Sequence, residues 1–165
     1  MKILIVSDTH RKDDNLKKVI EQVKPLDMFI HLGDAEGSEQ FIPEWLNPEC
    51  DIQMVRGNND FFSALDRERE IRIGKYRALL THGHYYNVSL GVEMIANEAA
   101  ERKLDIVMFG HTHRPCCEIR DDVVVLNPGS LSYPRQEGRK PSYMIMELDE
   151  RGEARFEQFY METDW

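Results

Sequence analysis

The chain has few cysteines and no long apolar run, and each absence excludes a class of protein. Among 165 residues only Cys50, Cys116 and Cys117 are cysteines, with no Cys-x-x-Cys spacing. We therefore expect a reducing, cytoplasmic setting without disulfides or a zinc ribbon, and three small buried or half-buried thiols. No apolar stretch approaches the roughly 18 residues of a membrane span. The first residues also lack the cleavage site of a signal peptide, so no membrane association is expected.

Basic residues are also in the minority, and the formal net charge is −9 at pH 7. Proteins that bind nucleic acid stably usually present a basic face, so stable binding to DNA or RNA is not expected. A small anionic substrate is compatible with this charge if bound cations reverse the field at the site. Hydrophobic residues make up 41% of the chain, enough for an ordered core, and the length suits a single domain over residues 1–165.

The first third of the chain alternates apolar runs with amphipathic segments, a pattern typical of parallel strands joined by helical crossovers. Strands are predicted at residues 2–8, 26–34 and 51–57. Apolar residues at helical spacing predict a helix that contains Leu16, Val19, Ile20 and Val23. Asp13 or Asp14 is expected to cap this helix, and Lys24-Pro25 to end it. A short helix is expected over 38–46, with Pro43 near its first turn.

The rest of the chain is typical of β-hairpins with one more helix. Hairpins are predicted over 70–83, 116–130 and 142–161. The helix is predicted from Val92, Ile95, Ala96 and Ala99, with Ser89 as its cap, and a buried strand from 105–111. The predicted class is α/β, with a mixed sheet or two packed sheets. The aromatic segment 155–165 is expected to cover a sheet edge, to form a contact in a symmetric homodimer or larger homo-oligomer, or to be buried within the monomer.

Five apolar runs, LIVSDTH, FIHLGD, MVRGNND, ALLTHGH and VMFGHTH, end in Asp, Asn or His where a strand should stop. Ligands bind outside the carboxyl ends of strands in open α/β sheets, so these side chains are expected to meet at one edge. They are Asp8, His10, Asp34, Asn58, Asn59, His82, His84, His111 and His113. Taken singly, each suits a cap, a turn or a half-buried structural position. Their joint placement is what predicts a shared site.

Imidazole and carboxylate ligands without cysteine favour Zn, Mn, Fe, Co or Ni. Seven of these side chains are too many for one tetrahedral ion, and they suit two ions that share a carboxylate. Two-metal sites hold their ions roughly 3.5–4 Å apart and clamp the attacking and leaving oxygens of a displacement at phosphorus. The sequence therefore predicts a dinuclear metal site.

The motifs SDTH (7–10), GD (33–34), GNND (57–60), THGH (81–84) and GHTHRP (110–115) resemble, in order and spacing, the signature of the calcineurin-like metallophosphoesterases. The short length, HLGD and the NPGS at 127–130 are similar to the small YfcE-like phosphodiesterases of bacteria and archaea. The resemblance implies two packed sheets flanked by helices. It also implies a metal-dependent phosphodiesterase that attacks a small phosphate ester with a hydroxide held by two ions, Mn being favoured over Zn, Fe, Ni or Co.

Carried over residue by residue, the resemblance assigns the first metal to Asp8, His10, Asp34 and His113. It completes the second with Asn58, His82 and His111, and makes Asp34 the bridge. Asn59 stands where many relatives have a histidine that assists the leaving group. His84 and Arg135 are further candidates for contact with substrate; a supporting role for His84 and a solvated Arg135 stay open. Asp60 is expected to shape its turn or orient a neighbour, and His31 to be a satisfied buried histidine.

Two other functions stay open. The retromer scaffold subunit resembles the same family, so a binding scaffold is an alternative; a scaffold would be free to lose ligands, whereas all seven are present here. Nuclease action is the other alternative. Relatives that act as nucleases carry added capping domains, for which 165 residues leave no room.

Overall fold

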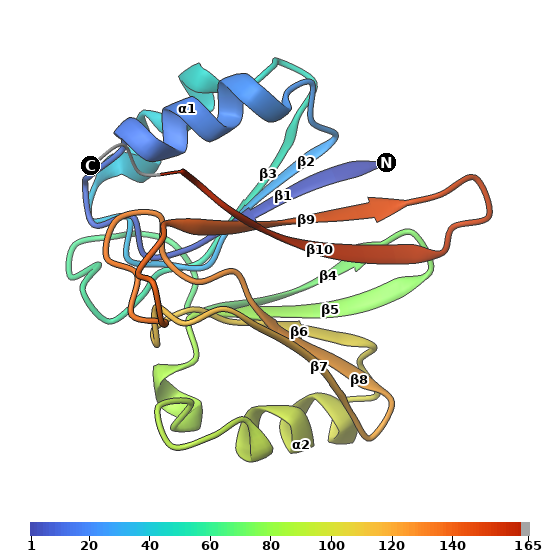
Figure 1. Cartoon of the computed structure of the whole chain (residues 1–165). Coiled ribbons are helices and arrows are strands. Elements are labelled where there is room, and N and C mark those ends of the chain that lie inside the picture. Colours follow the sequence, from blue (N-terminus) through green and yellow to red (C-terminus); the bar gives the residue numbers. More distant parts are fainter. Residues whose placement is uncertain (163–165) are drawn as a thin grey trace.

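The computed structural model describes residues 1–162 and contains two five-stranded β-sheets with an α-helix on the outer face of each (Figure 1). The first sheet contains β1 (Lys2–Val6), β2 (Met28–His31), β3 (Asp51–Met54), β9 (Ser142–Leu148) and β10 (Ala154–Tyr160). The second contains β4 (Glu68–Ile73), β5 (Tyr76–Thr81), β6 (Ile106–Met108), β7 (Cys116–Arg120) and β8 (Val123–Asn127). The helices are α1 (Asp14–Val23) and α2 (Glu93–Glu101). The expected α/β class with two packed mixed sheets is confirmed.

Both sheets combine parallel and antiparallel pairs, in the orders β10-β9-β1-β2-β3 and β4-β5-β6-β8-β7. β1, β2 and β3 run parallel, as do β5, β6 and β8. β9, β10, β4 and β7 pair antiparallel to their neighbours. As a result, the loops that follow β1, β2, β5 and β6 gather at one end of the molecule, on the left in Figure 1.

The apolar side chains of β1 show why the elements form layers. Alternate residues of a strand face opposite sides of its sheet. Ile3 and Ile5 are therefore buried between the sheets, whereas Leu4 and Val6 pack on the side of α1. The predicted helical stripes are confirmed, because Leu16, Val19, Ile20 and Val23 of α1 and Ile95, Ala96 and Ala99 of α2 are buried.

Three predictions about helix ends were wrong. The helix expected over 38–46 is two 3-10 helices, Ser38–Gln40 and Ile42–Trp45, because Pro43 can only occupy the first turn of a new helix. Val92, not Ser89, precedes α2, since a turn at Asn87, with φ 51°, delays the helix. Asp13 lies at the N-cap position of α1, but its carboxylate accepts a hydrogen bond from Ser38 Oγ at 2.7 Å instead of capping the helix.

The described part of the C-terminal aromatic segment forms the edge strand β10, which agrees with the first of its three expected roles, and its side chains are half-buried or exposed. Phe156 packs against the core between the sheets, and Phe159 stacks on Tyr143 with ring centroids 5.3 Å apart. Residues 163–165 of that segment lie outside the described residues, and the homo-oligomer contact stays a prediction. Within residues 1–162 no helix is long and apolar enough to cross a membrane.

The expectation for the cysteines was wrong at one position. Cys50 is buried and Cys116 half-buried, as expected, but Cys117 is exposed. Cys117 lies on β7, which is at the edge of the second sheet, and its side chain points away from the α2 layer that covers Cys116.

Candidate metal centre

The predicted ligands lie in five loops that follow β1, β2, β3, β5 and β6, and backbone hydrogen bonds tie these loops together. The amide of Asp8 donates to Gly33 O at 3.0 Å, and that of His10 to Asp34 O at 2.9 Å. Across the two sheets, the amide of His111 donates to Asp8 Oδ2 at 3.0 Å. The loops therefore form one connected unit rather than five independent turns.

Five of the seven predicted ligands have a left-handed backbone conformation. They are Asp8 (φ 56°), His10 (φ 45°), Asp34 (φ 58°), His111 (φ 69°) and His113 (φ 58°). Such a conformation costs on the order of 1–3 kcal/mol for a residue other than glycine, and it persists only where the surroundings enforce it. Its repetition at these positions shows that the loops are shaped to aim side chains.

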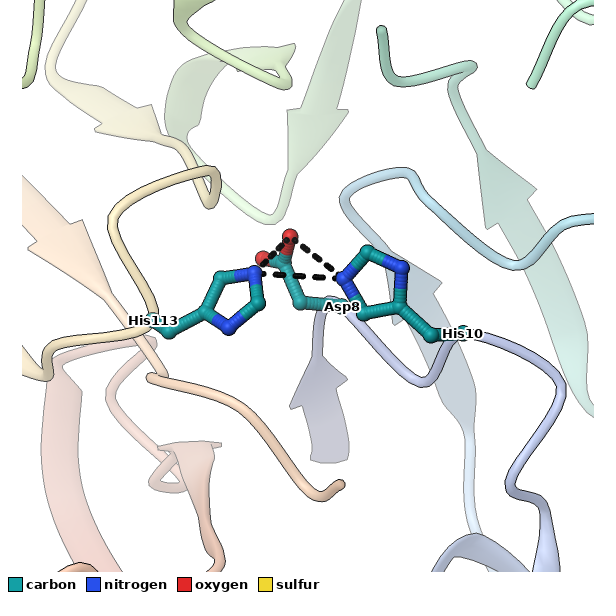
Figure 2. Close-up of side chains that lie close together, drawn as sticks. All are labelled: Asp8, His10 and His113. Carbon is teal, nitrogen blue, oxygen red and sulfur yellow. Dashed lines mark hydrogen bonds and ion pairs between the residues drawn. The ribbon is translucent and has the colours of Figure 1, made fainter. Parts of the chain in front are cut away.

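Asp8, His10 and His113 form the first group (Figure 2). His10 Nδ1 lies 3.2 Å from Glu36 Oε1, and His113 Nδ1 lies 2.8 Å from Tyr133 O, so each Nδ1–H has an acceptor. The two Nε2 atoms consequently face each other at 3.2 Å. This separation fits two ligands of one metal ion, because metal–nitrogen bonds of about 2.0–2.1 Å place such ligands roughly 3.0–3.4 Å apart.

Asp8, Asp34 and His82 form the second group. His82 has no exposed surface, and its Nδ1–H donates to Leu32 O at 2.7 Å, so Nε2 points toward the carboxylates. Neither His82 Nε2 nor Asp8 Oδ1 has a hydrogen-bond partner within residues 1–162. Buried polar atoms without partners are costly and rare. Here they are the types of atom that bind a transition-metal ion, so the residues fit a metal centre.

The two carboxylates lie between the two groups. Asp34 Oδ2 is 3.9 Å from His10 Nε2 and 3.3 Å from His82 Nε2. Asp8 Oδ1 is 3.7 Å and 3.8 Å from the same two nitrogens. Either oxygen is therefore in reach of both groups, as a ligand shared by two ions must be.

Asn58, His111 and His84 lie on the side of His82. Asn58 Oδ1 is 3.0 Å from His111 Nδ1, and the ring of His111 is 5.2 Å from that of His82. The ring of His84 is 5.5 Å from His82 and 6.0 Å from His111. Burial lowers the pKa of His84 to about 4. His84 is therefore neutral near pH 7, and its position suits a supporting role as well as contact with a substrate.

Asn59 and Asp60 hold Asp34 and its loop in place. Asn59 donates to Asp34 twice, from its backbone N–H to Oδ1 at 2.9 Å and from Nδ2 to Oδ2 at 2.8 Å. The buried carboxylate of Asp60 accepts three backbone N–H groups, from Gly57 at 2.7 Å, Asp34 at 2.8 Å and Glu36 at 2.6 Å. Asp60 was expected to shape its turn or to orient a neighbour, and these bonds do both.

The charges at the site are strongly coupled. Burial raises the pKa of Asp34, but the neighbouring His82 and the two N–H groups of Asn59 outweigh it and lower that pKa to about 2. Burial likewise raises the pKa of Asp8, yet His82 and His10 bring it well below its usual range. Burial lowers the pKa of His82, whereas Asp8 and Asp34 raise it to about 9. The two carboxylates thus favour a proton on His82, which a metal ion bound at Nε2 would displace.

Two glycines let the backbone approach the carboxylates, and a serine holds the backbone of Asp8. A Cβ at Gly57 would lie 2.1 Å from Asp34 Oδ1, and one at Gly110 would lie 2.7 Å from Asp8 Oδ2, so neither position accepts a side chain. Ser130, from the NPGS motif, donates its hydroxyl to Asp8 O at 2.7 Å. These residues explain why the motifs contain glycine and serine beside the ligands.

His31 is a satisfied buried histidine, as expected. Its Nδ1 accepts the N–H of Gly33 at 3.1 Å, and its Nε2 lies 3.0 Å from Thr9 Oγ1. Burial lowers its pKa to about 4. His31 therefore supports the loops after β1 and β2 as a neutral side chain.

The similarity to known proteins agrees with this geometry. Residues 1–151 match the calcineurin-like phosphoesterase superfamily domain. The chain belongs to this superfamily. It is 30% identical over 151 residues to the probable metallophosphoesterase YsnB of Bacillus subtilis, covering 90% of this chain and 85% of YsnB. It is 29% identical over 171 residues to the phosphodiesterase YfcE of Escherichia coli, covering 90% of this chain and 89% of YfcE.

The fold is also similar to that of Vps29. Wild-type Vps29 from Entamoeba histolytica, crystallised as a complex with zinc, superposes with a TM-score of 0.74 at 21% identity. The match covers 97% of this chain and 99% of that one. At this identity the likeness shows the calcineurin-like fold alone.

A pocket of about 760 Å³ opens beside the first group of this phosphoesterase domain. Its lining comprises His10, Glu36, His113, Arg114, Tyr133, Pro134, Arg135 and Arg139. The sequence singled out Arg135 but missed Arg114, Tyr133 and Arg139. Arg114 follows the GHTH motif directly, which was an available signal, whereas nothing in the sequence pattern marks Arg139.

We predict that Asp60→Asn destabilises the domain and weakens metal binding. The amide would place an N–H donor against backbone N–H groups, and hydrogen bonds to a charged group are worth about 1.5–3 kcal/mol. A loss of about 2 kcal/mol corresponds to a fall in Tm of roughly 4–8 °C at this size, and displaced ligand loops should weaken Mn²⁺ binding about tenfold or more. Thermal denaturation and Mn²⁺ calorimetry are the measurements. Asp66→Asn, on an exposed side chain, is the matched control, and equal values for the two variants would contradict the prediction.

Proposed function

We propose that this protein is a metal-dependent phosphodiesterase that hydrolyses a small phosphate ester at a dinuclear centre. The observation that carries the proposal is the buried convergence of two ionised carboxylates with unpartnered ligand atoms, Asp8 Oδ1 and His82 Nε2. Membership of the superfamily and the similarity to YfcE, which is named a phosphodiesterase, support it. The family resemblance favours manganese, and Zn, Fe, Ni and Co suit the same ligands.

The ligands divide between the two ions as the motifs suggest. The first ion is assigned to Asp8, His10, Asp34 and His113, and the second to Asn58, His82, His111 and Asp34. Asp34 is the proposed bridge because its Oδ2 lies between His10 and His82, and because Asn59 holds that oxygen from the other side. Glu36 and the Tyr133 carbonyl fix the rings of the first group by accepting their Nδ1–H groups.

The chemistry follows from charge and orientation. When bound, the two ions supply Lewis acidity and a water whose pKa is lowered toward neutrality. Two divalent ions against the carboxylates of Asp8 and Asp34 leave a net charge of about +2, which attracts phosphate into a chain of net charge −9. Asn59 donates hydrogen bonds but cannot deliver a proton near pH 7, so the leaving oxygen receives no acid catalysis from it.

Metal binding alone does not distinguish the phosphodiesterase hypothesis from the scaffold hypothesis. The similar Vps29 was itself crystallised with zinc. We therefore predict both binding and turnover: the Mn²⁺-loaded protein should hold two ions per chain and hydrolyse bis(4-nitrophenyl) phosphate, and removal of the metal by EDTA should abolish the activity. Elemental analysis and release of 4-nitrophenol are the measurements. One ion or none at saturating Mn²⁺ would exclude the dinuclear centre, and two ions with no hydrolysis of any phosphate monoester or diester would favour the scaffold.

If Asp34 bridges the two ions, its substitution should weaken metal binding more than substitution of Asn58. Asp34→Asn should weaken both metal sites, because the carboxylate serves both ions and its charge offsets their mutual repulsion. Asn58→Ala should weaken one site, because a neutral amide ligand serves one ion. Calorimetric Mn²⁺ titration of the two variants and the wild-type protein checks this. Equal losses confined to a single site in both variants would show that Asp34 does not bridge.

The position of Asn59 predicts how the rate depends on the leaving group. Positioned acid catalysis is typically worth about 10²–10⁴-fold. Without it, diesters with acidic phenol leaving groups should react well and alkyl esters poorly, so kcat/KM should fall steeply as the leaving-group pKa rises. Asn59→His should flatten this slope, mainly by helping poor leaving groups.

The measurement is kcat/KM across substituted aryl phosphodiesters at matched metal occupancy, since a new imidazole can also capture a metal. Asn59→Ala is the control, because it removes the side-chain hydrogen bond to Asp34 without adding an acid. If the histidine and wild-type slopes coincide at full occupancy, Asn59 orients Asp34 and does not stand at the leaving group.

A further inference from the structure

Three arginines in the pocket beside the metal centre have no part in the proposed chemistry. Arg114 directly follows a metal ligand, and Arg135 and Arg139 lie in the loop between β8 and β9. All three side chains are exposed, and within residues 1–162 none of their guanidinium groups forms an ion pair. Other arginines of the chain, such as Arg102 and Arg155, do pair with glutamates. The pocket therefore presents unneutralised positive charge beside the site where phosphate is expected.

This charge opposes the rest of the molecule, which carries a net charge of −9. Among residues 1–162, Glu36 is the only acidic residue in the pocket lining, and its carboxylate lies 3.2 Å from Nδ1 of His10. Lys12 adds a further cation at the rim, with Nζ 4.2 Å from the ring centroid of Tyr133. Like charges held close together repel one another unless an anion joins them. A bound anion is thus the ligand that this pocket suits.

We propose that the pocket binds a terminal phosphate on one arm of the substrate, so that the substrate is a phosphodiester carrying a second, unreacted phosphate. This rests on the proposed diesterase function. His10 and His113 line the pocket and also face Asp8 (Figure 2), so an arm attached to a phosphate at the metal centre would extend into the pocket.

A phosphate suits the arginines better than a carboxylate does. A phosphate monoester carries a charge of about −1.5 to −2 near pH 7 and has three acceptor oxygens. Guanidinium groups bind such oxygens through paired N–H donors. Three guanidinium groups can donate to all three oxygens of a phosphate and offset its double charge. A carboxylate has only one charge and two oxygens.

The test compares the affinities of two small probes for the Mn²⁺-loaded protein by calorimetry. Propyl phosphate has one phosphate for the metal centre, and propane-1,3-diol bisphosphate has a second one for the arginines. We expect the bisphosphate to bind at least about tenfold more tightly to the wild-type protein, a preference worth about 1.4 kcal/mol. The double variant Arg114→Gln/Arg139→Gln should reduce the preference to about twofold or less. Arg151→Gln, an exposed arginine in the β9–β10 turn, makes a matched change of charge and should leave it intact.

Equal affinity of the two probes for the wild-type protein, or a preference that survives in the double variant, would overturn the proposal. A probe with a carboxylate in place of the second phosphate, 4-phosphooxybutanoate, should show little preference; binding as tight as that of the bisphosphate would overturn the assignment of phosphate. Hydrolysis of bis(4-nitrophenyl) phosphate is measured separately. If the protein hydrolyses this diester but shows no arginine-dependent preference for the bisphosphate, only the proposed phosphate site in the pocket is rejected. If it prefers the bisphosphate but hydrolyses no diester, the phosphate site is supported and the diesterase function is rejected.

Discussion

The rest of the site depends on one electrostatic constraint, which is that two ionised carboxylates are buried side by side. Asp8 has no exposed surface and Asp34 has 1%. Burying an ionised carboxylate costs several kcal/mol unless opposite charge and hydrogen bonds offset it. The proton that the carboxylates favour on His82 offsets part of this cost. Asp8 Oδ1 still accepts no hydrogen bond within residues 1–162, which fits a site that binds cations.

Placing the carboxylates there requires backbone conformations that isolated loops would not keep. The left-handed residues at the ends of β1, β2 and β6 are held by hydrogen bonds between loops as well as by bonds within their own turns. Asp60 ties the loop after β3 to the loop after β2, and Ser130 ties the NPGS turn to Asp8. The bond from the His111 amide to Asp8 joins the two sheets at this end. Strain in the ligand loops is therefore offset by contacts that the whole fold supplies.

The helices, the strands and the meeting of polar residues at strand ends could be predicted from hydrophobic periodicity. Features that depend on contacts between distant parts of the chain could not. Helical stripes and apolar runs located α1, α2 and the strands, and parallel pairing implied that polar residues at strand ends would meet. Local capping rules failed for Asp13 and Ser89, because Ser38 competes for the Asp13 carboxylate and a turn at Asn87 delays α2. The arginine pocket was missed because its residues come from two separate loops, and single exposed arginines carry no pattern that predicts their proximity.

His113 connects the metal centre to that pocket. Its Nε2 faces Asp8, its Nδ1–H donates to Tyr133 O at 2.8 Å, and its carbonyl accepts the N–H of Arg135 at 3.0 Å. The segment that carries Tyr133 and Arg135 is therefore docked on His113 by two hydrogen bonds. Under the proposed function, this docking fixes the position of that segment relative to the metal centre, and a fixed geometry favours substrates whose two phosphates match it. The proposal then implies selection by the length of the substrate arm, in addition to selection by its charge.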